Sequence, residues 1–451
     1  MALAQRLLRG WQEPPDIAVA RLGSRRQHKN NSYPMNIPNT LFIGIDRSDK
    51  QLDFTVLDGA GGLIERGKVS TDPAALHPWI EGWRNRGAAN TRVVIAFEQP
   101  APNLVVFFGQ FEGIVIYPLN PTAVRSYCRS FAVSNAHSDR TDAAMIARYT
   151  FHYHGELRAL EQASGPMRHL RSLVEHRRTL IDERTVLTNR LQALLKLYFP
   201  QALKLLSEDL WRPMDCDFLL RWPSLQALRK ARPSTLDAFW AAHGSRSEKR
   251  LRERLDLLAG ARALTEDADT IAPFVLRVES LVRQLQVLAH SLEVVERRIE
   301  ELAPTFVDYA FFRALPGAGR AFAPRLLAAY GEDRSRWTSA SALQCYCGIA
   351  PITRQSGNTR CVIRRLHCPN FLRQSFHEWS AESWKHSRWA RAFVRYHQSH
   401  GKSFHTIIRM LAYKWIKILT RAWHDRELYD EERHLQCLSR RGSPICEYLD
   451  E

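Results

Sequence analysis

The sequence predicts three regions in order: an α/β domain, a long helical arm, and a mainly α-helical domain with a strong positive charge. Short β-type runs alternate with helical segments over residues 41–160, which is typical of an α/β domain. In the stretches 165–200 and 274–303, leucine and valine recur at helical spacing between charged residues. Between residues 313 and 423, 19 lysines and arginines stand against four acids. Nearly the whole net charge of the protein is therefore expected in the third region.

The order of elements in the first region predicts its topology. Five strands are expected from short apolar runs bounded by turn residues, at 41–46, 52–58, 63–70, 92–97 and 113–119. Helices are expected at 73–86, 102–111 and 138–151. Three strands joined by short turns, followed by helix, strand, helix, strand and helix, is the order of RNase H-like domains.

The domain boundaries follow from these changes in pattern. We expect a loose basic leader, an RNase H-like domain, a helical coiled-coil arm with an insert, a basic C-terminal domain and a tail; they span residues 1–40, 41–160, 161–310, 311–425 and 426–451. The two long helices of the arm are expected to fold back on each other, in a role of packing or dimerisation. Residues 201–270 give few functional clues.

Charge and cysteine content restrict the class of protein. The 451 residues carry 64 lysines and arginines against 47 acids, a net charge of +17. A surplus of this size favours a polyanionic partner, because each neutralised phosphate releases counterions. Nucleic acid is the commoner such partner, and an anionic membrane surface is the alternative. We expect no membrane-spanning helix, since no run of 18 or more apolar residues exists.

The eight cysteines are scattered and no secretion signal is evident, which indicates reduced thiols in the cytoplasm. If the partner is DNA, we expect the protein to associate with the bacterial nucleoid there. Four of them, Cys345, Cys347, Cys361 and Cys368, could be combined into a zinc site. Their C-x-C and C-x6-C spacings match no common zinc pattern, so buried thiols are the favoured interpretation.

Four acids occupy chemically suggestive places in the first region. Asp46 ends the first strand, Glu98 follows the fourth, and Asp139 and Asp142 lie at the start of the last helix. An acid in any one of these places is common. In an RNase H topology, however, the first and fourth strands are neighbours and the last helix packs across their ends, so the four carboxylates would converge. Clustered carboxylates fit Mg²⁺, which takes oxygen ligands, and paired metal ions stabilise the reacting oxygens of a phosphoryl transfer.

In the third region, Ser356 precedes glycine in a polar loop, a pattern that is usually only a turn. Arginines that could neutralise a phosphate surround it in the sequence: Arg354, Arg360, Arg364, Arg365 and Arg373. Residues 315–331 read as two helices around a glycine-containing turn, which is either a phosphate-binding hairpin or an ordinary helical turn.

These segments resemble a known family. IGIDRSDKQLDFTVLD, AFEQP and SDRTDAAMIARY are similar to the three motifs of the DEDD-type insertion-sequence transposases of the IS110 family, whose N-terminal domain is RuvC-like. LPGAGRAFAPRLLAAYGEDRSRWTSASALQCYCGIAPITRQSG and RRLHCPNFLRQSF resemble the second transposase domain of that family. The resemblance covers about residues 41–200 and 311–423.

The resemblance implies roles by position. Asp46, Glu98, Asp139 and Asp142 match the acidic tetrad that binds Mg²⁺, and Ser356 matches the serine that forms a covalent bond with DNA. It also implies a noncoding bridge RNA that selects the element ends and the target by base pairing. A dimer or tetramer is expected, because recombination holds two duplexes together.

Two other functions remain open at this stage. In a hydrolytic junction-resolving nuclease the tetrad would activate water and Ser356 would be incidental. In an inactive relic, the chain would bind nucleic acid without cleaving it.

Overall fold

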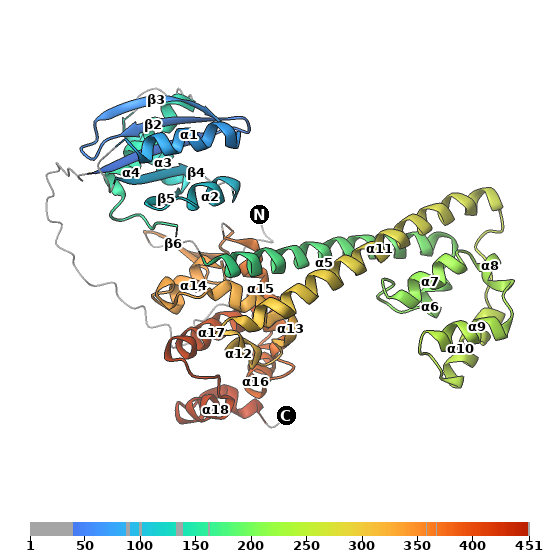
Figure 1. Ribbon diagram of the computed structural model, residues 1–451. Coiled ribbons are helices and arrows are strands. Elements are labelled where there is room, and N and C mark those ends of the chain that lie inside the picture. Colours follow the sequence, from blue (N-terminus) through green and yellow to red (C-terminus); the bar gives the residue numbers. More distant parts are fainter. Residues whose placement is uncertain are drawn as a thin grey trace. The chain divides into compact units, whose positions relative to one another are not determined.

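The computed structural model describes residues 39–86, 91–98, 102–131, 139–160, 163–357, 359–366 and 368–449. The chain forms two compact units, Met1–Gln162 and Ala163–Glu451, which are described separately below (Figure 1). The expected basic leader lies almost wholly outside the described residues.

The first unit is built on a mixed five-stranded sheet of order β3-β2-β1-β4-β5. Its strands are β1 (Thr40–Arg47), β2 (Gln51–Leu57), β3 (Leu63–Ser70), β4 (Arg92–Glu98) and β5 (Ile114–Leu119). β2 pairs antiparallel with β1 and β3, whereas β4 pairs parallel with β1 and β5. The predicted α/β sheet is confirmed, and its strand order is consistent with an RNase H-like domain.

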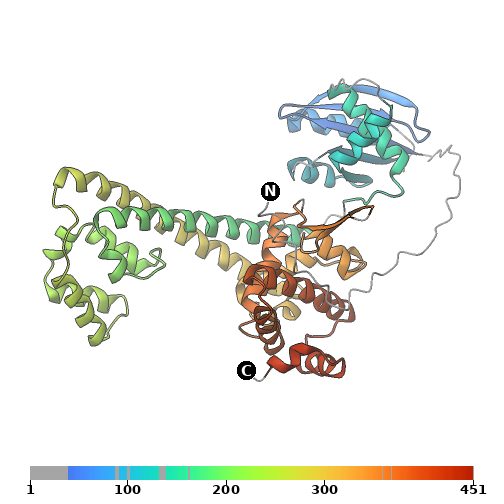
Figure 2. The ribbon, with the colours of Figure 1, turned by 180° about the vertical axis from the view of Figure 1, so that it is seen from behind.

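Helices cover both faces of this sheet (Figures 1 and 2). The helices are α1 (Pro73–Arg84), α2 (Pro102–Gly109), α3 (Pro121–Phe131) and α4 (Asp139–Tyr153). Ile43 and Ile45 of β1 join a core with α1 and α2, while Phe42 joins a second core with α3 and α4. Burial on both faces explains why β1 is a continuous apolar run, since each such side chain contributes about 1.5–3 kcal/mol when buried.

The second unit contains two long helices, α5 (Gly165–Tyr198) and α11 (Ala268–Leu302), which lie side by side (Figures 1 and 2). At one end of the pair, Leu170 and Ile299 belong to a core shared with the C-terminal helices. At the other end, Leu191 and Val282 belong to a second core. The same two helices are therefore part of two separate cores along their length.

The second core is formed with the helices of the insert. These are α6 (Ala202–Leu205), α7 (Pro213–Arg221), α8 (Leu225–Arg229), α9 (Pro233–Ala242) and α10 (Glu248–Ala259). Asp215 is buried at the start of α7 and accepts hydrogen bonds from the backbone N–H and the hydroxyl of Ser207. The hydroxyl of Tyr198 donates to the carbonyl of Pro223 at 2.6 Å. These bonds fix the path of the insert beside the ends of α5 and α11.

The C-terminal part is mainly helical, as predicted, with one β-hairpin that was not predicted. Its elements are η1 (Ala303–Thr305), α12 (Tyr309–Arg313), α13 (Gly319–Tyr330), η2 (Arg334–Arg336), α14 (Ala340–Tyr346), β6 (Ile352–Ser356), β7 (Thr359–Ile363), α15 (Asn370–Ser383), α16 (Arg388–Ser399), α17 (Phe404–Asp425), α18 (Glu431–Arg440) and η3 (Pro444–Tyr448). Trp379, Trp415 and Trp423 are fully buried in its core. None of the described helices is long and apolar enough to span a membrane.

Candidate functional site

Asp46 and Glu98 occupy adjacent places at one end of the sheet. The parallel register of β1 and β4 pairs Ile45 with Phe97, so the two acids come next on neighbouring strands. Side chains alternate along a strand, and Ile45 and Phe97 face the core formed with α1 and α2. Asp46 and Glu98 therefore point to the opposite face, the one that α3 and α4 cover.

Gly44 brings α4 directly onto this face. A Cβ atom at Gly44 would collide with the backbone nitrogen of Ala147 and the carbonyl oxygen of Ala143, and would lie 2.8 Å from the Cα atom of Ala147. Only glycine permits the main chain of a helix to approach a strand so closely. Asp142 immediately precedes Ala143, so this contact places its backbone beside the strand that carries Asp46.

The three carboxylates share one electrostatic environment. Burial raises the pKa of the Glu98 carboxyl above its ordinary value, the charge of Arg125 opposes this, and the carboxylates of Asp46 and Asp142 raise it further. Asp46 accepts a hydrogen bond from the backbone N–H of Arg47 at 3.0 Å. All three side chains are half-buried, so they are open on one side.

The donor chemistry of this group fits Mg²⁺, because every candidate ligand is a carboxylate oxygen. Within the described residues, no three side chains of the His, Cys, Asp and Glu types are grouped closely enough to hold a metal ion. Asp139 is the first residue of α4, but its side chain lies outside what the structure describes. Among the residues that the structure describes, the four cysteines considered for zinc belong to no such group either, and all eight cysteines are free thiols.

Two residues of α3 that the sequence interpretation missed belong to this site. Arg125 acts on the pKa of Glu98, as noted above. Burial raises the pKa of the Cys128 thiol, and the charges of Asp142 and Glu98 raise it further. The sequence did contain a signal for the start of α3. Asparagine before a helix and proline at its first position are common start signals, and here Asn120 Oδ1 accepts a hydrogen bond from the backbone N–H of Thr122, just after Pro121.

Ser356 is the last residue of β6, not part of an irregular loop. It pairs with Thr359 of β7 across a tight turn in which Gly357 has a φ of +56°. The serine side chain is exposed, as are most residues of this hairpin. The nucleophile candidate is thus held at the tip of a hairpin, open to a large substrate.

The register of the hairpin places Arg354 and Arg360 on opposite faces. Residues two apart on a strand share a face, so Arg354 lies on the same face as Ser356. Arg360 pairs with Gln355 and therefore lies on the opposite face. Of the two, Arg354 can approach a phosphate that contacts Ser356.

The other candidate arginines follow the hairpin. Arg364 is exposed, and the half-buried Arg365 has an Nε atom without a hydrogen-bond partner among the described residues. Arg373, in the first turn of α15, donates to Asn370 Oδ1 at 2.7 Å. Neither Arg364 nor Arg373 forms an ion pair with any carboxylate that the structure describes.

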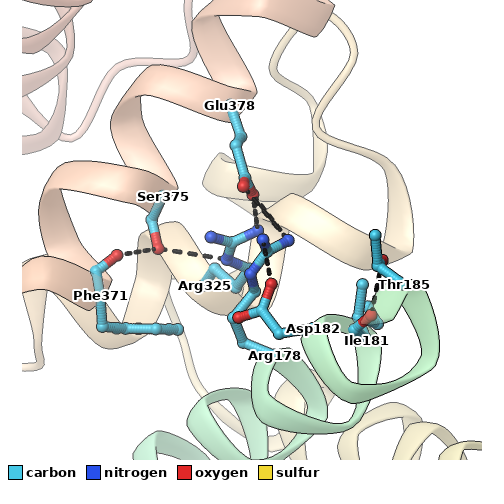
Figure 3. A network of polar contacts seen from close by, with 8 residues as sticks. All are labelled: Arg178, Ile181, Asp182, Thr185, Arg325, Phe371, Ser375 and Glu378. Carbon is cyan, nitrogen blue, oxygen red and sulfur yellow. Dashed lines mark hydrogen bonds and ion pairs between the residues drawn. The ribbon is translucent and has the colours of Figure 1, made fainter. Parts of the chain in front are cut away.

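An ionic network around the buried Arg325 holds α15 in place (Figure 3). Arg325 of α13 donates to Glu378 Oε2 at 2.8 Å and to Ser375 Oγ at 3.1 Å. Arg178 of α5 lies 3.2 Å from Glu378 Oε1 and also bonds Asp182 at 2.6 Å. One carboxylate thereby joins α15 to both α13 and the long helix α5.

Comparison with known proteins identifies the family. Residues 43–200 match a transposase family of the DEDD type defined by IS110, and residues 309–395 match the family described as Transposase IS116/IS110/IS902. The chain belongs to the IS110 family of transposases. The two matches include Asp46, Glu98, Asp139, Asp142 and Ser356, and together they cover more than half of the chain.

Relatives of this IS110-family protein match over most of its length. The mini-circle IS117 protein of Streptomyces coelicolor, named as a candidate transposase, is 27% identical over 406 residues, which are 87% of this chain and 96% of that protein. An uncharacterized 44.8 kDa protein of insertion element IS116 from Streptomyces clavuligerus is 25% identical over 324 residues, covering 70% of this chain and 77% of its own. An uncharacterized 43.6 kDa protein of insertion element IS110 from S. coelicolor is 28% identical over 235 residues, 52% of this chain and 56% of its own.

Proposed function

We propose that this transposase cleaves and rejoins DNA strands through a covalent bond between Ser356 and DNA, assisted by Asp46, Glu98, Asp139 and Asp142. The observation that supports it most is the placement of three of these acids on one face at one end of the sheet. The exposed position of Ser356 in a basic region adds to that support.

In the cleavage step, Ser356 Oγ forms an ester bond to the phosphorus of one DNA phosphodiester and loses its proton. The bond from that phosphorus to one deoxyribose oxygen breaks, and the released oxygen takes up a proton as a free hydroxyl. Rejoining is the reverse step with the hydroxyl of another strand, so the energy of the phosphodiester is retained. Arg354, on the face of Ser356, neutralises charge on the reacting phosphate.

The acids would hold Mg²⁺, which when bound supplies positive charge for the phosphate and favours ionisation of the attacking hydroxyl. Glu98 and its neighbours repel one another without a cation, which is the property that creates affinity for a divalent ion. Arg125 contributes a fixed positive charge at the same place.

The partners follow from this chemistry. The DNA substrates are the element ends and the target, and a noncoding guide RNA selecting them is consistent with a net charge of +17. We further propose a homodimer or homotetramer, in which acids and serine are supplied by different protomers, acting at the nucleoid in the cytoplasm.

Covalent trapping tests the proposal. The protein with its co-purified RNA is incubated with labelled element-end DNA and Mg²⁺, denatured, and analysed on a gel. We expect a slow, protease-sensitive protein–DNA band that Ser356→Ala and Asp46→Asn abolish. Cleaved ends without an adduct, unaffected by Ser356→Ala but lost in Asp46→Asn, would instead indicate a hydrolytic metal-dependent nuclease.

A matched pair of variants on the hairpin refines the test. Arg354→Gln should slow adduct formation at saturating DNA by about 100-fold, the usual cost of one charge-stabilising donor. Arg360→Gln, on the opposite face, should change that rate by less than about threefold. Equal effects of the two substitutions would contradict the assignment of Arg354 to the reacting phosphate.

A further inference from the structure

Five basic side chains meet where α15 packs on α17, and we call them the α15–α17 basic cluster. Arg373 and His377 lie one helical turn apart on α15, and His405 and Arg409 lie one turn apart on α17. The rings of His377 and His405 stack with their centroids 6.2 Å apart, so the two pairs face each other. Arg364, in the segment between β7 and α15, is close enough to act on Arg409.

The positive charges of the three arginines in this cluster are not compensated by an ion pair within the described part of the chain. Burial lowers the pKa of the Arg409 guanidinium, and the like charges of Arg364 and Arg373 lower it further. Burial also lowers the pKa of His377, with Arg409 as the next cause, and the Glu378 carboxylate, a smaller cause, acts in the opposite direction. None of the three arginines forms an ion pair with a described carboxylate, and all of the cluster's side chains are at least partly exposed.

A structural role would produce a different arrangement. The nearby Arg325 is buried, and its charge is matched by Glu378; it also donates to Ser375, while its Nη2 atom has no hydrogen-bond partner among the described residues. Arginines gathered without acids raise the free energy of the folded protein, since like charges repel. Such a group is typical of a site whose counter-charge is supplied by a ligand.

The cluster is separated from Ser356 by the length of the hairpin. Thr359, the first residue of β7, pairs with Ser356, and β7 ends at Ile363 just before Arg364. Four residue steps of a strand span about 13 Å. An anion held at the cluster is therefore distinct from the phosphate that Ser356 would attack.

We propose that the α15–α17 basic cluster binds a backbone phosphate of the DNA strand that Ser356 cleaves, about four nucleotides from the cleaved bond at about 3.4 Å per nucleotide. Arginine guanidinium groups suit this ligand, because they bind phosphate oxygens in pairs. Holding a second phosphate fixes the strand's position along the hairpin and so determines which bond reaches Ser356. The identity of the cleaved strand rests on the proposed function, whereas phosphate binding by the cluster does not. His405 and Arg409 lie beyond residues 309–395, so the C-terminal family match does not include them.

The test is a binding titration of the full-length protein without metal ions. Fluorescence anisotropy of the labelled nucleic acid measures binding at several salt concentrations. A labelled DNA duplex and a labelled single-stranded RNA, both of mixed sequence, are the two probes. Arg409→Gln should weaken duplex binding by about tenfold and reduce the slope of log affinity against log salt by about one. Arg364→Gln, at an exposed position where folding is not at risk, should have the same effect.

Arg421→Gln is the matched control, because Arg421 lies on the same helix, is 86% exposed and pairs with Asp425. It should leave affinity and salt slope unchanged. Arg409→Gln should not lower the melting temperature, since it removes a repelled charge; a lower melting temperature with unchanged duplex binding would indicate a structural role and overturn the proposal.

Unchanged affinity for both probes would also overturn it, and a loss confined to RNA would overturn the assignment to DNA. If the wild-type protein forms no serine–DNA adduct while Arg409→Gln still weakens duplex binding, the proposed function fails and the phosphate site stands. Failure of the two inferences is therefore distinguishable.

Discussion

The two units hold their candidate residues in place by different means. In the first, Gly44 lets the main chain of α4 rest on β1, so Asp142 is positioned by backbone contact. In the second, α15 is held by buried charges, with Glu378 joining Arg325 and Arg178. Half-buried acids repel one another, so a rigid main-chain contact is needed to keep them close together. A basic surface that binds a large substrate is exposed, and ion pairs between side chains are enough to hold the helix that carries it.

The largest expected effect on stability comes from removing the charge of Glu378, which holds α15 in place. Glu378→Gln leaves the buried Arg325 without its counter-charge and should lower the free energy of unfolding of the second unit by about 3–4 kcal/mol. Glu301→Gln is the control, because its pair with Arg298 is exposed and should be worth less than about 0.5 kcal/mol. Urea unfolding followed by tryptophan fluorescence measures both. Similar values for the two variants would show that the network does not hold α15.

Disturbing the main-chain contact between β1 and α4 at Gly44 should have a somewhat smaller effect on stability. Gly44→Ala forces α4 away from β1 and should destabilise the first unit by about 2–3 kcal/mol. Gly82→Ala is the matched control, because the position in α1 is open and alanine should stabilise the helix by about 0.5–1 kcal/mol. Amide hydrogen exchange, which resolves the two units, measures the difference. Equal protection in both variants would contradict the close packing of α4 on β1.

Much of the first unit could be predicted because its signals are strong. Strands buried on both faces leave continuous apolar runs, and the predicted strand at 92–97 lies within β4 (Arg92–Glu98). The acids at the ends of β1 and β4 could be located because a parallel register follows from the strand order. α3 was missed because its apolar positions are few, although Asn120 and Pro121 mark its start.

The hairpin that bears Ser356 could not be read from periodicity. Its strands are exposed on both faces, so they lack the alternation of apolar and polar residues that burial imposes. The one available signal was Gly357 followed by asparagine, a pair typical of two-residue hairpin turns. The clustering of Arg409 with Arg364 and Arg373 joins residues far apart in the chain, and no local pattern indicates it. The coiled-coil character of the arm stays a prediction.

A further expected effect concerns acid, and it should be confined to the second unit. Burial lowers the pKa of His397 to about 4, with Lys402, His400 and Lys414 as further causes, and its Nδ1 atom has no hydrogen-bond partner in the described part of the chain. Because the folded form resists protonation, the unfolded chain binds the extra proton as the pH falls from about 6.5 to about 4. The free energy of unfolding should therefore decrease over that interval and level off below it. In His397→Phe this decrease should be smaller in urea titrations across the same range; an unchanged pH profile would contradict it.

The two cores along α5 and α11 have a consequence for how the family can vary in length. Each helix must present apolar residues to both cores, and the 34 and 35 residues of the pair span about 50 Å at about 1.5 Å per residue. Inserting one or two residues in either helix would rotate one end away from its core. Relatives with longer or shorter arms are therefore expected to differ by about seven residues, two helical turns, in both helices at once. The distance between the insert and the C-terminal helices is thus a quantity that evolution can change only in discrete steps of about 10 Å.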